Sequence, residues 1–145
     1  MNARSIKNSS DLIKQIVIED DIPILTLTET WLREIDIFDT LNVCPNGYVF
    51  LRNDRKGKNG GGVAVLCSEF LKPSVVKSQQ YNSFEHLIIS VKSAPNSARI
   101  VALYRPPSSS QALFIEEFTS FLEEHTLSGD PIVLSGDFNI HYDSE

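Results

Sequence analysis

Two segments far apart in the chain each carry an apolar, strand-like run that leads to an acidic residue. The first is residues 24–31 (ILTLTETW), with Glu29, and the second is residues 133–141 (VLSGDFNIH), with Asp137. A buried strand holds a carboxylate rigidly only where the strand leaves the core, and ligands in α/β sheets bind beyond the carboxyl ends of strands. The two segments therefore predict a sheet protein whose strand ends converge on one hard cation.

The composition limits the alternatives to one globular domain. The chain has 145 residues, of which 41% are hydrophobic and 22% are charged, as is typical of a folded domain. No apolar run approaches the roughly 20 residues that span a bilayer, so we expect no membrane association and an intracellular location. Cys44 and Cys67 are too few and too isolated for a metal cluster, and we expect free thiols.

One basic segment stands out in an otherwise acidic chain. The net charge of −6 argues against nucleic-acid binding through the whole surface. Residues 52–58, however, carry +3, which leaves −9 for the rest of the chain. The basic side chains of this segment are Arg52, Arg55, Lys56 and Lys58. Two interpretations stay open: a solvated turn, which is the usual reading of a charge run, or a contact with a phosphate backbone.

Hydrophobic periodicity predicts a mixture of strands and helices. A helix capped by Ser9 or Ser10 should end near Asp20, and a second should follow the loop at residues 106–110. The strand-like runs are residues 22–27, 48–51, 63–67, 87–91, 99–104 and 132–135, with 75–77 as a minor one. The apolar stripe of the second helix is Phe114, Ile115, Phe118, Phe121, Leu122 and His125. This order predicts a layered α/β protein, in which His125 packs rather than binds a ligand.

Four motifs follow one another along the chain at residues 27–31 (LTETW), 60–64 (GGGVA), 104–107 (YRPP) and 136–141 (GDFNIH). Together they resemble the endonuclease/exonuclease/phosphatase superfamily, and most of all the apurinic-endonuclease-like domain of non-LTR retrotransposons. Asn2 is similar to the asparagine that ends the family's first strand. The resemblance covers nearly the whole chain, and it implies a layered α/β sandwich of the deoxyribonuclease I-like type.

The resemblance also implies that residues 1–145 form a partial domain. The family's first strand would precede Asn2, and its carboxy-terminal Ser-Asp-His motif has no counterpart in these residues. We therefore expect a domain that lacks its first strand and its C-terminal part. His141 does not replace the family's histidine, and a local role at the edge of the site is expected for it.

The resemblance assigns roles that agree with the chemistry of the residues. Mg²⁺, or Mn²⁺ as the alternative, binds through one or two carboxylates, and Glu29 is implied as its main ligand, with Asn2 beside it. Asp137 would orient or activate the attacking water. Asn139 would hold the phosphate or Asp137 itself, and the Tyr104 hydroxyl would donate to the developing charge. Without the other motifs, Asp137 and Asn139 would be interpreted as an Asx turn after a strand, and Tyr104 as an aromatic residue at an interface.

The implied function is Mg²⁺-dependent hydrolysis of DNA phosphodiester bonds by a retrotransposon-type endonuclease. In complete form it would nick DNA for a reverse transcriptase domain of the same polyprotein, in the nucleus, and this partial chain is expected to have weak or no activity. Two alternatives stay open: another phosphoesterase of the superfamily, such as a phosphatase or deadenylase, or a non-catalytic remnant that binds nucleic acid through the basic segment. Glu29, Tyr104, Asp137 and Asn139 should meet at one rim of the sheet, away from His125.

Overall fold

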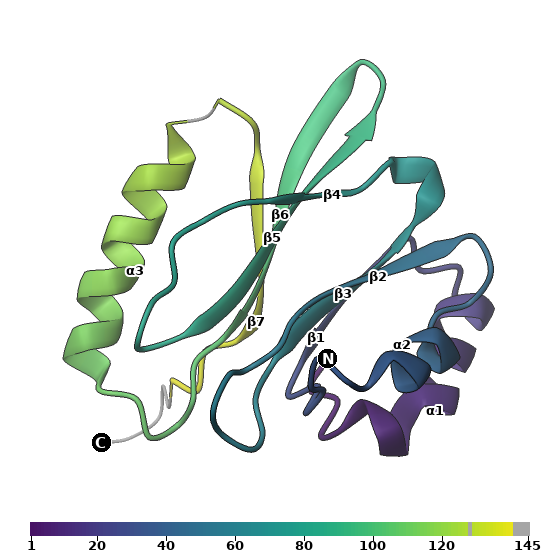
Figure 1. Ribbon diagram of the computed structural model, residues 1–145. Helices are drawn as coiled ribbons and strands as arrows, with labels where there is room; N and C mark the ends of the chain where they lie inside the picture. The colour runs from purple at the N-terminus through teal and green to yellow at the C-terminus, as the bar shows by residue number, and fades with distance from the viewer. Residues whose placement is uncertain (128, 141–145) are drawn as a thin grey trace.

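Two β-sheets pack face to face in the computed structural model, which describes residues 1–127 and 129–140 (Figure 1). The three-stranded sheet has the order β1-β3-β2 and is antiparallel; its strands are β1 (Ile24–Thr28), β2 (Tyr48–Asn53) and β3 (Val63–Ser68). The four-stranded sheet has the order β4-β5-β6-β7 and consists of β4 (Ser74–Val76), β5 (Glu85–Ser93), β6 (Asn96–Tyr104) and β7 (Ile132–Asp137). Only the β6–β7 pairing in it is parallel.

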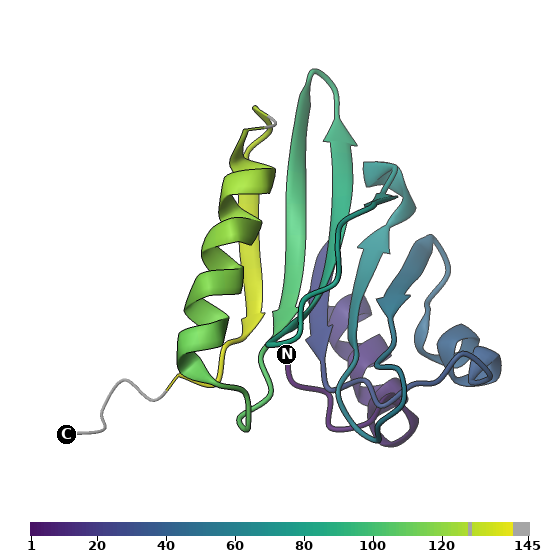
Figure 2. The same ribbon diagram turned by 60° about the vertical axis from the view of Figure 1, so that its left-hand side comes forward.

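Helices cover the outer face of each sheet, so the described chain forms four layers (Figure 2). Helices α1 (Ile6–Glu19) and α2 (Ile37–Val43) lie on the three-stranded sheet, and α3 (Gln111–Thr126) lies on the four-stranded sheet. A short 3-10 helix, η1 (Glu69–Leu71), follows β3. This arrangement confirms the predicted layered α/β sandwich. None of the described helices is both long and apolar enough to cross a lipid bilayer.

Strand β3 shows why the two sheets stack. Successive side chains of a strand point to opposite faces, and both faces of β3 are buried. Val63, Val65 and Cys67 pack between the sheets, whereas Ala64 and Leu66 pack under the helices. The continuous apolar run of β3 therefore fills two cores at once, and its neighbours β1 and β2 flank it on either side.

The structure confirms the two predicted helices, with the first ending at Glu19 and the second following the loop at residues 106–110, but it corrects their details. Helix α1 begins at Ile6, after Ser5, and not at a cap on Ser9 or Ser10. The Ser9 hydroxyl instead donates back to the carbonyl of Ser5 at 2.8 Å, as serine does inside a helix. The short helix α2 was not predicted, because Val43 is the one buried residue in it. In α3, Ile115 lies outside the apolar stripe and is 57% exposed.

A buried histidine under α3 should make the stability of the fold sensitive to acid. His86 is 2% exposed, its Nε2 lies 2.6 Å from the Ser78 hydroxyl, and burial together with the nearby His125 lowers its pKa to about 4. In the unfolded chain this pKa is about 6.5, so only the unfolded state gains the proton between these values. The free energy of unfolding should therefore fall by up to about 3 kcal/mol as the pH drops from about 6.5 to about 4.

Urea denaturation across this pH range measures the effect. The His86→Gln variant should show a shallower loss than the wild type, because the variant has no imidazole to protonate on unfolding. An identical pH dependence in the two proteins would show that His86 does not carry the effect.

Candidate active site

The four predicted residues lie at the rim where β1, β6 and β7 end. Tyr104 and Asp137 are the last residues of β6 and β7 and face each other in register. Glu29 follows β1, and its φ of 54° turns the chain away from the sheet. One backbone hydrogen bond, from the Ser5 N–H to the Glu29 carbonyl at 2.9 Å, fixes this turn against the start of α1. The strand ends of both sheets thus deliver polar side chains to one edge.

Two neutral donors hold the Glu29 carboxylate. The Tyr104 hydroxyl donates to Oε1 at 2.8 Å, and the Trp31 indole Nε1 donates to Oε2 at 3.3 Å. Tyr104 is 4% exposed; burial, and then the hydrogen bond to Glu29, raise the pKa of its hydroxyl to about 12. The phenol therefore keeps its proton at neutral pH and acts as a donor.

Asp137 forms the second half of the rim. Asn2 Nδ2 donates to its Oδ2 at 3.3 Å, and the backbone N–H of Asn139 donates to its Oδ1 at 3.1 Å. Asn2 in turn pairs with Thr28 in an isolated parallel bridge, which brings it beside the Glu29 segment. These residues line a hollow of about 570 Å³. The structure thus brings Asn2 and Asp137 together on the same side of the sandwich as Glu29 and Tyr104.

Arg105 holds the loop after β7, and the sequence analysis missed this role. Its buried guanidinium donates to the carbonyls of Phe138 and Asn139, at 3.3 and 2.9 Å, and to that of Ser109 at 2.7 Å. Asn139 Nδ2 donates back to the Arg105 carbonyl at 2.6 Å. The amide of Asn139 is therefore occupied in shaping the loop. The available signal was the position of Arg105, directly after Tyr104 in the YRPP motif.

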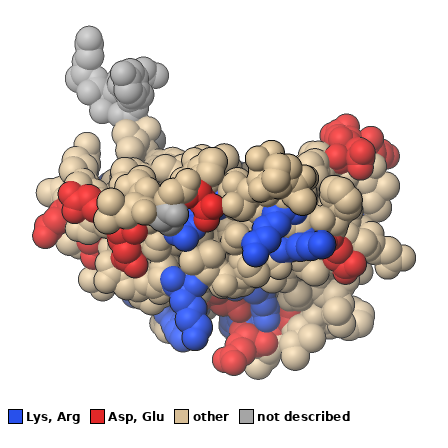
Figure 3. Space-filling view, turned by 90° about the horizontal axis from the view of Figure 1, so that it is seen from above, with Lys and Arg blue, Asp and Glu red and all other residues tan. Residues whose placement is uncertain are grey.

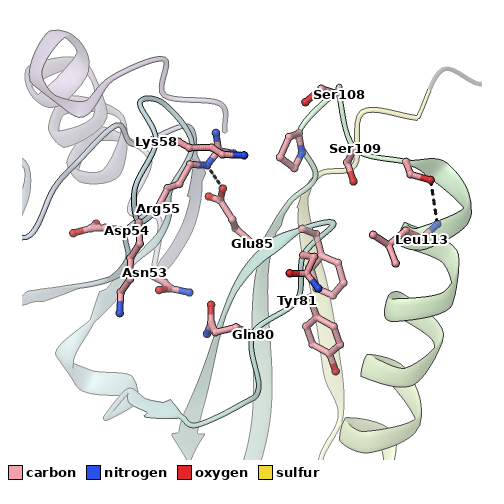
Figure 4. A pocket seen from close by; sticks show the side chains of 15 residues that line it. Asn53, Asp54, Arg55, Lys58, Gln80, Tyr81, Glu85, Ser108, Ser109 and Leu113 are labelled. Carbon is pink, nitrogen blue, oxygen red and sulfur yellow. Dashed lines mark hydrogen bonds and ion pairs between the residues drawn. The ribbon is translucent and has the colours of Figure 1, made fainter.

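The basic segment divides into paired and unpaired cations. Arg52 Nη1 lies 3.3 Å from Asp54, and Arg55 is paired with Glu85. Lys56 and Lys58 are exposed, and no ion pair involves them among the described residues. Together with a serine-rich stretch before α3, they line a groove of about 700 Å³ (Figure 4). At the opposite end of the sandwich, acidic and basic side chains are interspersed (Figure 3).

The sequence analysis also made predictions for His125 and His141, and it missed Glu85. His125 packs on the outer face of the four-stranded sheet, with its ring 4.7 Å from that of Phe121, and it is not part of the rim. Glu85, which binds Arg55, had no motif to reveal it. His141 lies outside the described residues.

The oxygen donors of the rim suit a hard cation with few protein ligands. The described residues contain no group of three or more His, Cys, Asp or Glu side chains that could hold a metal. Mg²⁺ does not need one, because it binds through one or two carboxylates and keeps waters or substrate oxygens as its other ligands. Glu29 and the Asn2 amide offer donors of that kind, whereas a structural zinc site would need four nitrogen or sulfur ligands.

Comparison with known proteins identifies relatives of this fold. The profile of the Endonuclease/Exonuclease/phosphatase family matches residues 1–145. No curated protein matches the sequence significantly. A similar solved structure is the endonuclease domain of TRAS1, a telomere-specific non-LTR retrotransposon, with a TM-score of 0.71 and 11% identity over 98% of this chain and 59% of that one.

Two other solved structures, of proteins with different names and ligands, are also similar. D. rerio TDP2 complexed with single-strand DNA product has a TM-score of 0.67 and 12% identity, over 94% of this chain and 55% of that one. The mannosyl-6-phosphatase Bt3783 of Bacteroides thetaiotaomicron has a TM-score of 0.68 and 15% identity, over 98% of this chain and 60% of that one. The chain thus spans somewhat more than half the length of these structures. At identities this low, the TM-scores show a shared fold alone.

Proposed function

Since the chain belongs to the endonuclease/exonuclease/phosphatase family, we propose that it is a divalent-metal-dependent phosphoesterase whose substrate is DNA. The observation that carries this proposal is the Glu29 carboxylate, which Tyr104 and Trp31 hold at 2.8 and 3.3 Å at the rim that also bears Asp137. A half-buried carboxylate that neutral donors orient just beyond the end of a strand is suited to bind a cation rather than to stabilise the core.

We assign the cation to Glu29, with Asn2 beside it, and Mg²⁺ as the ion, Mn²⁺ being the alternative. When bound, such a cation supplies charge stabilisation to the phosphoryl oxygens. Asp137 orients the attacking water and takes up its proton. Its two oxygens accept bonds at 3.3 and 3.1 Å from Asn2 and from the backbone of Asn139, and these bonds fix the direction in which it faces.

Tyr104 and Asn139 complete the proposed mechanism. The high pKa of Tyr104, about 12, keeps its proton on the hydroxyl, which donates to Glu29 in the structure. During the reaction the same O–H would turn from Glu29 to donate to the charge that develops on the phosphate. Of the two roles considered for Asn139, holding Asp137 is favoured over holding the phosphate. Its backbone N–H contacts Asp137, and its side-chain amide already bonds to Arg105.

DNA is favoured as the substrate by the neighbours and by the unpaired lysines. TRAS1 is named as a retrotransposon endonuclease, and the TDP2 structure contains a DNA product. The groove beside the rim presents Lys56 and Lys58, whose charges suit a phosphate backbone. On this proposal the chain acts in the nucleus, as part of a longer polyprotein that also carries a reverse transcriptase. A phosphatase remains the second candidate, because Bt3783 has a similar TM-score.

The endonuclease and phosphatase hypotheses differ in what they predict for Lys56 and Lys58. As a partial domain, the purified chain with Mg²⁺ is expected to nick supercoiled plasmid only weakly. The double variant Lys56→Ser/Lys58→Ser should weaken plasmid binding while leaving any hydrolysis of mannose 6-phosphate unchanged. Two lost phosphate contacts should reduce the slope of log K against log salt by about 2. Nicking and salt-titrated binding by fluorescence anisotropy measure both effects.

A matched control comes from the other end of the molecule. Lys72 and Lys92 line a hollow near the β5–β6 hairpin, and the variant Lys72→Ser/Lys92→Ser removes the same charge there. It should leave the salt slope unchanged. Hydrolysis of mannose 6-phosphate without nicking would favour the phosphatase. Equal slopes of log K against log salt for the two double variants would place the DNA contact elsewhere.

A further inference from the structure

An ion pair fastens the two sheets together at the rim. Arg55 lies in the loop between β2 and β3, and Glu85 is the first residue of β5. Arg55 Nε donates to Glu85 Oε1, and the backbone N–H of Gly62 donates to Glu85 Oε2 at 2.6 Å (Figure 4). Both charged side chains are only 19% exposed. Glu85 therefore uses both of its oxygens to fix a loop of the three-stranded sheet onto the four-stranded sheet.

The same guanidinium covers the ring of Tyr104. Glu85 stands directly opposite Tyr104 in the β5–β6 pairing, and Arg55 Cζ lies 5.6 Å from the ring centroid, within cation–π range. Gly61 has a φ of +69°, and a Cβ added to it would overlap the guanidinium. The glycine run thus has a physical reason here, since it leaves room for Arg55 above the tyrosine.

The loop that Arg55 anchors also holds the segment of Glu29. The backbone N–H of Trp31 donates to the Gly61 carbonyl at 2.9 Å, and that of Thr30 donates to the Gly62 carbonyl at 3.3 Å. Each end of the Tyr104–Glu29 hydrogen bond is therefore tied to the same loop. The Tyr104 end is covered by Arg55, and the Glu29 end is attached through the backbone.

We propose that Arg55, held by Glu85, is a positioning residue that fixes the Tyr104 ring so that its hydroxyl donates to Glu29. This inference deepens the proposed function and rests on it only for its catalytic consequence. Glu85 neutralises the charge of Arg55, so the effect is one of geometry. Lysine keeps the charge but lacks the planar fork that binds Glu85 and covers the ring, so Arg55→Lys should behave like Arg55→Gln.

A double-mutant cycle in urea unfolding tests the inference without any need for activity. Tyr104→Phe removes the hydroxyl and keeps the ring. Arg55→Gln changes the unfolding equilibrium constant by a certain factor in each background. If Arg55 positions the hydroxyl, that factor should be at least about threefold smaller in Tyr104→Phe than in the wild type. Effects that agree within about twofold in the two backgrounds overturn the inference, because they would mean that Arg55 only packs against the ring.

Arg99→Gln is the matched control for this cycle. Arg99 forms an ion pair with Asp130 at 3.6 Å and is 20% exposed, and it lies five residues before Tyr104 on β6, or about 16 Å along the strand. Its loss should be additive with Tyr104→Phe. If Arg55→Gln does not fold, Glu85→Gln replaces it in the cycle, since the glutamine still accepts from Gly62 but no longer pairs with Arg55.

The catalytic consequence is measured separately. Arg55→Gln should lower kcat for plasmid nicking about tenfold without raising KM, and it should cause no further loss in the Tyr104→Phe background. Additive losses in kcat overturn the inference. If no variant nicks DNA, the proposed function fails, and the unfolding cycle still decides whether Arg55 positions Tyr104.

Discussion

Replacing Glu29 with alanine should reduce metal-dependent nicking at least about 10²-fold, which is the scale of losing one preorganised group that stabilises charge in a transition state. The Glu29 carboxylate accepts hydrogen bonds from both Tyr104 and Trp31, at 2.8 and 3.3 Å, so its loss removes the proposed cation ligand and frees both donors. Rates at saturating Mg²⁺, together with melting curves that confirm folding, measure the effect.

A second substitution separates metal binding from the hydrogen bonds. Glu29→Gln keeps an acceptor for Tyr104 but has no charge, so it should lose activity nearly as fully as Glu29→Ala. Trp31 is the only tryptophan in the chain and contacts Glu29, so its fluorescence should report Mn²⁺ binding in the wild type and not in Glu29→Gln. Glu116→Ala, which removes an exposed carboxylate on α3, should change neither signal. Full activity of Glu29→Gln would contradict the assignment of the cation.

The Phe121→Ala variant should lose about 3–5 kcal/mol of stability, the largest single effect expected in the core. Phe121 is fully buried, and its ring centroid lies 5.8 Å from that of Phe84, 6.1 Å from that of Phe118 and 4.7 Å from that of His125. Truncation leaves a cavity between α3 and the four-stranded sheet. Because whole domains are stable by only about 5–15 kcal/mol, the variant should be close to unfolded at physiological temperature.

A neighbouring position on the same helix supplies the control. Ile115 is 57% exposed, so Ile115→Ala should change stability by no more than about 0.5 kcal/mol. Urea denaturation of both variants, with the m-value checked for two-state behaviour, measures the difference. Similar losses in the two variants would mean that α3 packs through a different face from the one described.

The strands and the rim could be predicted because their signals are local. A continuous apolar run predicts β3, and the acidic residues that follow β1 and end β7 predict where polar groups leave the core. Helix α2 could not be predicted, because it buries only Val43 and has no apolar stripe. The positions of Glu85 and Arg105 depend on partners about 30 residues away, at Arg55 and Asn139. No local pattern encodes such contacts, and only the packed sheets bring them together.

The contact between Asn2 and Asp137 has a consequence for how the protein folds. These two side chains are 135 positions apart, and β7 reaches β6 only after α3 has crossed the sheet. Contacts between residues so distant in sequence form late, because the entropy of closing the chain must be overcome first. We therefore expect partly folded chains to lack the assembled rim and, with it, the proposed cation site. Such chains carry Glu29 and Asp137 as separate charges without a shared site.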